Sequence, residues 1–403
     1  MILFLIPGVV FSIHMTENFL LSEIFQASGY QIDSRLITPG DVFFAIRGEK
    51  NDGHDFLKEV QSKGARAAVV SKHYLGSDFG LRLFGVDDVG QTLRDLAKKS
   101  LENSTIQIVG VTGSVGKTTT KDFIATLLEG KFRVGKTQES QNSKLTFPLT
   151  VLNRPKDAEI LVLEMGMSEM GDIARLVEIA PPDVAVLVKV GLAHAAYFPG
   201  GMEEIARGKT QIFAHPKTKF AIADRDYGLP NISIFKGEDW PVFQEAHLNH
   251  NLAAAVSVAR YFGMTDREIF ERIPHLKLPK MRFERSEKNG ILLINDAYNA
   301  NPESMKAALF GLQAYKRRKI AILGSMKELG TFSESAHVEI GNLALQTVDH
   351  LFVIGEEWKV GERFENHESL ALRLKEIMRE GDVVLIKGSR SLCMEKVICY
   401  CGF

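Results

Sequence analysis

A glycine-rich segment, GVTGSVGKTTT from Gly110 to Thr120, carries the residues with the clearest chemical potential in this sequence. Glycines allow backbone amides to close around phosphate oxygens, and a helix that starts at the lysine would add a favourable dipole. The lysine supplies a fixed positive charge, and the next hydroxyl can bind a magnesium ion that bridges two phosphates. The segment therefore predicts a site for ATP and Mg²⁺, made by Thr112, Gly113, Ser114, Val115, Gly116, Lys117, Thr118 and Thr119.

Three further side chains could act beside those phosphates. Glu164 ends the apolar run AEILVLE, and a carboxylate at the carboxyl edge of a parallel strand is well placed to hold a metal ion. His194 follows the run VAVLVKV, and Lys209 lies fifteen residues later. Taken alone, these residues also fit a solvated glutamate at a strand end, a structural histidine and a surface lysine.

The elements that position these residues alternate between strand and helix patterns. Strand-like runs at 105–111, 160–163, 184–190 and 220–223 are separated by helix-length segments, which favours a parallel sheet covered on both faces. A second set of runs starts at Ile291, Lys319, His350 and Asp382, with helical patterns over 304–315, 336–346 and 370–378, and indicates a Rossmann-like unit. We expect three domains, at residues 16–104, 105–277 and 278–403.

Composition narrows the possible partners. The chain of 403 residues has 49 basic and 50 acidic residues, so it lacks the basic surface that binding of nucleic acid requires. Its three cysteines lie in the last eleven residues, which favours a reducing compartment, and we expect a cytoplasmic monomer. The apolar stretch from Met1 to Ile13 is shorter than the ~20 residues that span a bilayer, so no stable membrane insertion is expected. It could be untranslated sequence before Met15, an added strand or a weak surface anchor.

Several longer motifs resemble the Mur ligase family, over Asp33 to Glu395. They are DSR from Asp33, PGDVFFAIRGEKNDGHDF from Pro39, LEMGMSEMGDIARL from Leu163, HLNHNLAAA from His247, NDAYNANPESMKAAL from Asn295, GSMKELG from Gly324 and KGSRSLCMEKV from Lys387. The spacing of Gly110, Gly113 and Gly116 also fits that family. The resemblance implies an α/β fold with three domains, a central P-loop ATPase-like parallel sheet and a C-terminal Rossmann-like domain.

The resemblance also implies an ATP-dependent ligase that forms amide bonds. The signature DNPR is absent, which favours the family member that adds D-alanyl-D-alanine to UDP-N-acetylmuramoyl-tripeptide through an acyl phosphate in peptidoglycan synthesis. By the same likeness Lys117, His194 and Lys209 would be catalytic, with Lys209 carbamylated, and Thr118, Glu164, His194 and Lys209 would hold Mg²⁺. The residues implied for the nucleotide are Asn251, Arg282 and Asp296, and those implied for the substrate are Ser34, Arg35, Asn142, Tyr298 and Asn301. A turn could instead explain Ser34 and Arg35, and an asparagine-proline turn could explain Tyr298 and Asn301.

Four positions depart from the family pattern. Ser143, Lys189, Gln211 and Ser325 stand where the family has two asparagines and two acidic residues, which bears on metal affinity and substrate contacts. Three other functions are alternatives: folylpolyglutamate synthetase, a P-loop transport ATPase and a non-catalytic scaffold. The N-terminal region opposes the first, missing ATPase signatures oppose the second, and the retained Lys117, Glu164 and Lys209 oppose the third. Diaminopimelate and lysine both stay open as the third residue of the tripeptide.

Overall fold

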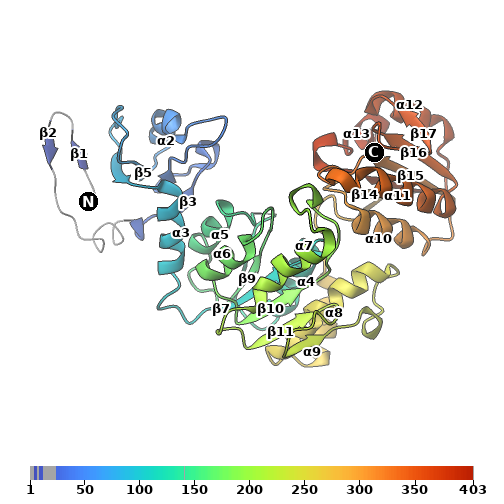
Figure 1. Cartoon of the computed structure of the whole chain (residues 1–403), viewed down its shortest axis with the longest axis horizontal. Helices are drawn as coiled ribbons and strands as arrows, with labels where there is room; N and C mark the ends of the chain where they lie inside the picture. The colour runs from blue at the N-terminus through green and yellow to red at the C-terminus, as the bar shows by residue number, and fades with distance from the viewer. Residues whose placement is uncertain (1–3, 7–8, 12–23, 140, 403) are drawn as a thin grey trace. The chain divides into compact units, whose positions relative to one another are not determined.

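The computed structural model describes residues 4–6, 9–11, 24–139 and 141–402 (Figure 1). Contacts divide the chain into two units, of which unit 1 contains residues 1–106, 141–158 and 175–180 and unit 2 contains the rest. Within the N-terminal stretch, β1 (Phe4–Ile6) and β2 (Val9–Phe11) pair antiparallel. Met15 and Thr16, where we considered a translation start, lie outside the described residues. None of the described helices is long and apolar enough to cross a bilayer.

Unit 1 is built on a parallel sheet of four strands. In spatial order these are β3 (Tyr30–Gln31), β4 (Val42–Phe44), β5 (Ala67–Ser71) and β6 (Arg82–Val86). Its helices are α2 (Leu57–Ser62), α3 (Val89–Lys99) and α5 (Thr146–Leu152). The Asn153 side chain joins the α5 end to β3, because it accepts from the Tyr30 amide and donates to the Tyr30 carbonyl, both at 2.9 Å.

Unit 2 contains two sheets of six strands each. The central sheet is parallel throughout, in the spatial order β12 (Ile232–Ile234), β11 (Phe220–Ala223), β10 (Val184–Leu187), β7 (Gln107–Thr112), β9 (Ile160–Glu164) and β8 (Val134–Lys136). The helices of this region are α4 (Lys117–Leu128), α7 (Gly201–Thr210), α8 (Ala246–Tyr261) and α9 (Asp266–Arg272). The helix α6 (Asp172–Ile179) is divided, because its residues 172–174 belong to unit 2 and its residues 175–179 belong to unit 1. The strand β9 is buried along its whole length, as expected for a parallel strand covered on both faces.

The second sheet of unit 2 is mixed. Its order is β13 (Glu284–Lys288), β14 (Ile291–Asp296), β18 (Val383–Lys387), β15 (Lys319–Gly324), β16 (His350–Ile354) and β17 (Glu362–Phe364), and only the β13–β14 pair is antiparallel. The helices are α10 (Pro302–Leu312), α11 (Ser333–Thr347), α12 (His367–Ile377) and α13 (Lys396–Cys401). The α/β class inferred from the alternating runs is confirmed.

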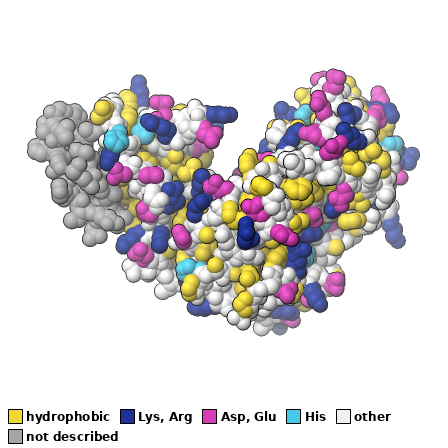
Figure 2. Space-filling view, in the orientation of Figure 1, with side chains coloured by type: hydrophobic (Ala, Val, Ile, Leu, Met, Phe, Trp, Pro, Cys, Tyr) yellow, Lys and Arg dark blue, Asp and Glu magenta, His cyan; other side chains and the backbone are white. Residues whose placement is uncertain are grey.

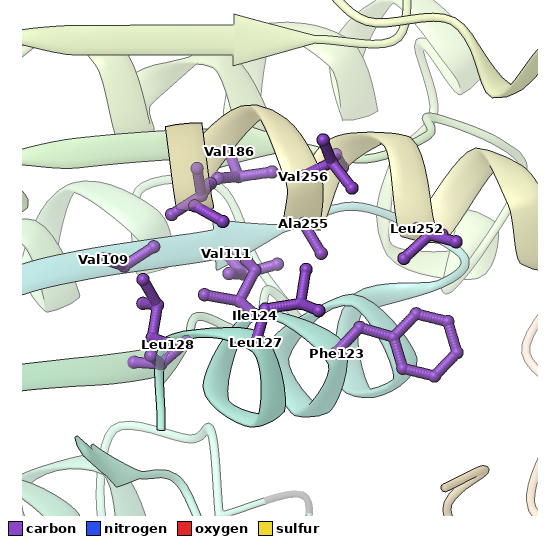
Figure 3. Packing of buried hydrophobic residues seen from close by; sticks show 14 of the residues in the cluster. Val109, Val111, Phe123, Ile124, Leu127, Leu128, Val186, Leu252, Ala255 and Val256 are labelled. Atoms are coloured by element: carbon purple, nitrogen blue, oxygen red, sulfur yellow. The ribbon is translucent and has the colours of Figure 1, made fainter. Parts of the chain in front are cut away.

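The helices α4 and α8 pack together over the central sheet and share its main apolar core (Figure 3). The core side chains in that view are Val109, Val111, Phe123, Ile124, Leu127, Leu128, Val186, Leu252, Ala255 and Val256. Truncation of a large side chain in such a core typically costs ~2–5 kcal/mol. This packing fixes the start of α4, and therefore the glycine-rich loop that precedes it, against the carboxyl edge of the sheet.

Charged side chains are distributed evenly over the visible surface. On the face drawn in Figure 2, lysines and arginines are interspersed with aspartates and glutamates, in keeping with a formal net charge of −1.

Candidate active site

The glycine-rich loop connects β7 to α4 in the conformation that a phosphate loop requires. Gly116 precedes the first residue of α4 with a left-handed backbone, at φ 86°. A Cβ atom at this position would lie 2.4 Å from the Asn251 Oδ1 atom of α8, so a side chain has no room. Glycine is needed here for its conformation and for the close approach of α8.

Hydroxyl groups tie this loop to its neighbours. The Ser114 Oγ donates to the Gly191 carbonyl at 2.8 Å, and its amide donates to the Lys189 carbonyl at 2.6 Å. The Thr112 Oγ1 donates to the Met165 carbonyl at 2.8 Å. The loop is therefore anchored to the segments that follow β9 and β10, and Val115 remains half-buried at its tip.

Lys117, the first residue of α4, folds back over the loop. Its Nζ donates to the Gly113 carbonyl at 2.9 Å. Burial lowers the pKa of the Lys117 ammonium, while the charge of Glu164 opposes this shift and that of Arg282 adds to it. Lys117 thus lies within electrostatic reach of a proposed metal ligand and of a proposed nucleotide-binding arginine.

Thr118 and Glu164 meet beneath the loop. The Thr118 Oγ1 donates to the Glu164 Oε2 at 2.8 Å, and the two residues are buried, at 3% and 1% exposed. Thr119, next to Thr118, is also buried. A buried hydroxyl and carboxylate at the carboxyl end of β9 form the oxygen-rich pair that magnesium prefers. The part of the chain that the structure describes has no group of three His, Cys, Asp or Glu residues suited to a metal. A magnesium ion held by this pair would take its other ligands from phosphates and water.

Lys209, on α7, is a buried lysine that has no direct partner among the described residues. It is 3% exposed, and none of the described residues makes a hydrogen bond or ion pair with its Nζ. Burial holds the pKa of Lys209 well below its usual value of 10.5, Lys117 adds to the shift, and Glu164 opposes it. A buried amine of this kind can exist uncharged and can react as a nucleophile.

His194 stands in a left-handed conformation, at φ 57°, immediately before a short 3₁₀ turn. Its Nδ1 lies 2.7 Å from the Glu328 Oε2, so the imidazole is held by a carboxylate. Burial lowers the pKa of His194, and Glu328 opposes this, while Lys117 and Lys209 add to it. The lowered pKa favours the neutral imidazole at pH 7, which is the form that can bind a metal ion.

The residues implied for the nucleotide lie on a helix, a connection and a strand of unit 2. Asn251 is buried on α8 beside Gly116. The Arg282 guanidinium lies 4.0 Å from the centre of the Tyr298 ring, a cation–π contact. Asp296 ends β14, where it accepts from the Phe283 amide at 3.0 Å and pairs with the Lys387 Nζ at 2.6 Å. Arg282, Tyr298 and Asp296 therefore form one group around the connection into β13.

Asn301 has a local structural role. Its Oδ1 accepts from the Ser304 amide at 2.9 Å, and the Ser304 Oγ accepts from the Asn301 amide, so the pair caps α10. The alternative that an asparagine-proline turn explains this residue thus has direct support. Its contact with a substrate stays a prediction.

Ser34, Arg35 and Asn142 belong to unit 1. The Ser34 Oγ donates to the Glu59 Oε2 at 3.0 Å, and the Ser34 carbonyl accepts from the Lys63 Nζ at 2.9 Å. Arg35 is exposed and pairs with Asp33 at 2.6 Å. The guanidinium is held by both oxygens of the Asp33 carboxylate, through its Nε and Nη2 atoms.

The four departures from the family pattern have different surroundings. Lys189 is exposed, 3.9 Å from Glu303, and the Gln211 Oε1 is buried without a hydrogen bond from the described residues. Ser143 bonds Thr146 at the start of α5. Ser325 is buried and donates to the Glu357 Oε2 at 2.5 Å. A carboxylate therefore does reach position 325, although it comes from another segment of the chain.

Sequence reasoning missed several polar residues of this site. They are Lys121, Thr137, Glu328, Glu357 and Lys387. Lys387 and Glu328 belong to the quoted motifs KGSR and GSMKELG, so their motifs could have pointed to them. Thr137 and Glu357 lie in segments without a distinctive pattern, and only the folded chain brings them to the site.

Comparisons with known proteins agree with this geometry. Three family models match: Mur ligase middle domain over residues 111–260, Mur ligase glutamate ligase domain over 281–390, and Mur ligase family catalytic domain over 26–77. The UDP-N-acetylmuramoyl-tripeptide–D-alanyl-D-alanine ligase of Bacillus subtilis is 31% identical, with 92% of each chain covered. The ligase of the same name from Synechocystis is 30% identical, over 94% of this chain and 92% of its own. The crystal structure of the MurF ligase from Thermotoga maritima in complex with ADP has a TM-score of 0.82 and 34% identity, and covers 94% of this chain and 98% of its own.

Proposed function

The chain belongs to the Mur ligase family, and from this we propose that it joins D-alanyl-D-alanine to UDP-N-acetylmuramoyl-tripeptide with ATP, as its relatives' names describe. The observation that carries the proposal is the glycine-rich loop with Lys117, set above the buried Thr118–Glu164 pair. A carboxylate resists attack by amines, so the enzyme must first convert it to an acyl phosphate. The family assignment leaves no support for a transport ATPase.

In the proposed first step, an oxygen of the tripeptide carboxylate attacks the γ-phosphorus of ATP, and the bond to ADP breaks. Lys117 is placed to leave the Gly113 carbonyl and follow the phosphoryl oxygens as charge moves. Thr118 and Glu164 would hold Mg²⁺, which when bound neutralises phosphate charge. In the second step, the dipeptide amine attacks the acyl carbon, and phosphate leaves as the amide forms and the amine loses its proton.

We further propose that Lys209 is carbamylated. An uncharged lysine amine adds to carbon dioxide, which forms an N–C bond and releases one proton, and the product is a carboxylate. The burial of Lys209, its lowered pKa and its lack of a direct partner among the described residues support this. A carbamate would place an anion where Lys117 now repels a cation, and with His194 it would add oxygen and nitrogen ligands for a second Mg²⁺.

The substrate contacts remain proposals as well. Asn251, Arg282 and Asp296 are proposed for ATP, and Tyr298, Asn301, Asn142, Ser34 and Arg35 for the peptide and uridine parts of the substrate. Their support is the family membership and, for Asn251, its position beside Gly116 of the loop. We propose that the enzyme acts as a monomer in the cytoplasm.

The decisive experiment measures phosphate released from ATP by the purified full chain. We expect release only when UDP-N-acetylmuramoyl-tripeptide and D-alanyl-D-alanine are both present, because the acyl phosphate is consumed by the amine. Mass spectrometry should detect the pentapeptide product in the same samples. Equal phosphate release without the dipeptide would reject the ligase function, and running the assay with diaminopimelate- and lysine-containing tripeptides would identify the natural third residue.

A further inference from the structure

Lys121 is a buried lysine of α4, and no step proposed above uses it. It lies one turn after Thr118 and is 1% exposed. Its Nζ donates to the Thr137 carbonyl at 2.7 Å and to the Glu139 carbonyl at 2.9 Å. Burial of an ammonium group costs several kcal/mol unless its hydrogens are satisfied, so these two bonds determine the backbone path of residues 137–139.

Thr137 connects that segment to β9. It is 0% exposed and follows β8, where its amide donates to the Val162 carbonyl at 3.0 Å. Its Oγ1 accepts from the Glu164 amide at 2.9 Å. The Thr137 carbonyl is directed to Lys121, and the threonine hydroxyl takes over the acceptor role toward β9. The backbone of Glu164 thus depends on Thr137, and Thr137 depends on Lys121.

Thr118 and Lys121 are three residues apart, so they lie on the same face of α4. Thr118 bonds the carboxylate of Glu164, and Lys121 holds the segment that bonds its amide. We propose that Lys121 is a positioning residue that sets the orientation of Glu164 toward magnesium through Thr137. This inference rests on the proposed role of Thr118 and Glu164 as magnesium ligands.

A simpler role, in which Lys121 only neutralises Asp122, fits the distances less well. The Asp122 Oδ1 lies 3.7 Å from the Lys121 Nζ, beyond hydrogen-bond distance, and 2.7 Å from the Lys136 Nζ. Asp122 therefore already has a closer cation. Lys136 also provides a matched control, because it shares the same carboxylate and makes no recorded bond to the carbonyls of Thr137 or Glu139.

The test measures Mn²⁺ binding to the full chain in the presence of ADP, by electron paramagnetic resonance. The variants are Lys121→Met, Lys121→Gln, Thr137→Val, the Lys121→Met/Thr137→Val double variant and the control Lys136→Met. Thr137→Ser retains the hydroxyl and serves as the conservative rescue. Melting temperatures and the Mg²⁺ concentration for half-maximal ligase rate are recorded for each.

Loss of a residue that orients a metal ligand typically weakens metal affinity 10- to 100-fold. We expect Lys121→Met and Thr137→Val each to weaken Mn²⁺ binding at least tenfold, and the double variant to be no weaker than the worse single variant, since both act in one chain of contacts. Thr137→Ser should restore most of the affinity, and Lys136→Met should bind as the wild type does.

Wild-type affinity in Lys121→Met, or independent effects that multiply in the double variant, would overturn the inference. Failure of both Lys121 variants to fold would assign this lysine to general stability and would overturn it too. Mn²⁺ binding by the wild type distinguishes failure of the proposed metal site from failure of the proposed role of Lys121. If it binds no Mn²⁺ with ADP, the proposed metal site fails; if it binds and Lys121→Met binds equally, only the role of Lys121 fails.

Discussion

The charge of Lys117 acts on the buried amine of Lys209, and this has consequences at the scale of single residues. Burial is the main cause of the lowered pKa at both lysines, and Lys117 adds to the shift at Lys209. Binding of a phosphate group would offset the cost of burying the Lys117 ammonium. Lys209 lacks a comparable partner among the described side chains. Its conversion to an anion would therefore remove the unfavourable interaction with the charge of Lys117.

Replacement of Lys117 by alanine should strongly reduce turnover. The lost contact acts where charge moves during phosphoryl transfer, so we expect the rate constant kcat to fall by ~10²–10³-fold, roughly 3–4 kcal/mol. Steady-state phosphate release at saturating ATP measures the effect. Lys131→Ala is a suitable control, since Lys131 bonds the Gly263 carbonyl near the surface. A Lys117→Ala enzyme with near-normal kcat would show that the loop lysine has no part in the chemistry.

Carbamylation of Lys209 predicts a spectroscopic signal. Protein equilibrated with ¹³C-bicarbonate should show a carbamate carbonyl resonance by NMR, and Lys209→Arg should lack both the resonance and ligase activity, because a guanidinium does not add to carbon dioxide. Lys219→Arg should retain both, since Lys219 is a surface lysine with its side chain 66% exposed. Unchanged activity in Lys209→Arg would contradict the proposal.

At the scale of elements, α8 contributes to two apolar cores. Leu252, Ala255 and Val256 pack in the core of the central sheet, whereas Leu248 packs with Phe283 in the core of the mixed sheet. Glu245, just before the helix, is buried and pairs with Arg285 of β13 at 2.5 Å, and it also accepts a hydrogen bond from the Tyr315 hydroxyl. The start of α8 therefore fastens the two sheets of unit 2 together.

His247, in the first turn of α8, should make the stability of unit 2 sensitive to acid. Burial lowers the pKa of His247 to about 3, with further lowering by Lys387 and Arg285. The unfolded chain, with a histidine pKa near 6.5, binds this proton more readily than the folded chain. The protonation of His247 therefore does not reduce stability above pH ~6.5. As pH falls from there toward ~3, the free energy of unfolding decreases by up to ~1.4 kcal/mol per pH unit.

Melting temperatures between pH 7.5 and 5 test this expectation. The wild type should lose stability steadily below pH ~6.5, and His247→Gln should lose less, since it cannot take up the proton. Some dependence will remain in the variant, because burial also lowers the pKa values of His194, His250 and His337. Parallel curves for wild type and variant would show that His247 is not a source of the acid sensitivity.

The sequence patterns predicted the elements that carry apolar runs and missed those that do not. Runs such as ILVLE and DVVLIKG correspond to buried strands β9 and β18. The strands β13 and β17, with the sequences ERSEK and ERF, are mostly exposed edge strands without an apolar pattern. Their pairing comes from backbone hydrogen bonds to an inner strand, which leave no periodic trace in the sequence.

For the site, a local motif was enough to find the phosphate loop, while the partners of its residues required the fold. Gly116, Lys117 and Thr118 are contiguous, so their geometry follows from one strand–loop–helix connection. The loss of an acidic residue at position 325 suggested a missing carboxylate. Glu357 reaches Ser325 across a separation of 32 residues, because the ends of β15 and β16 are neighbours.

At the scale of the whole molecule, the two compact units do not follow the linear order of the chain. Segments 141–158 and 175–180 belong with the N-terminal residues in unit 1, although they lie within the expected central domain. The boundaries at residues 104 and 277 stay predictions. The helix α5 illustrates the exchange, since it lies in unit 1 with α3 and is followed by Asn153, which pairs with Tyr30.

This interleaving limits how the protein can be dissected. A recombinant fragment that starts at residue 105 would retain α5 but lose α3, the helix against which α5 packs. We expect size-exclusion chromatography to show that such a fragment aggregates. Co-expression of the missing residues 1–104 should restore a monodisperse species. An exchange of the N-terminal part of unit 1 between relatives would likewise succeed only if α5 were exchanged together with it.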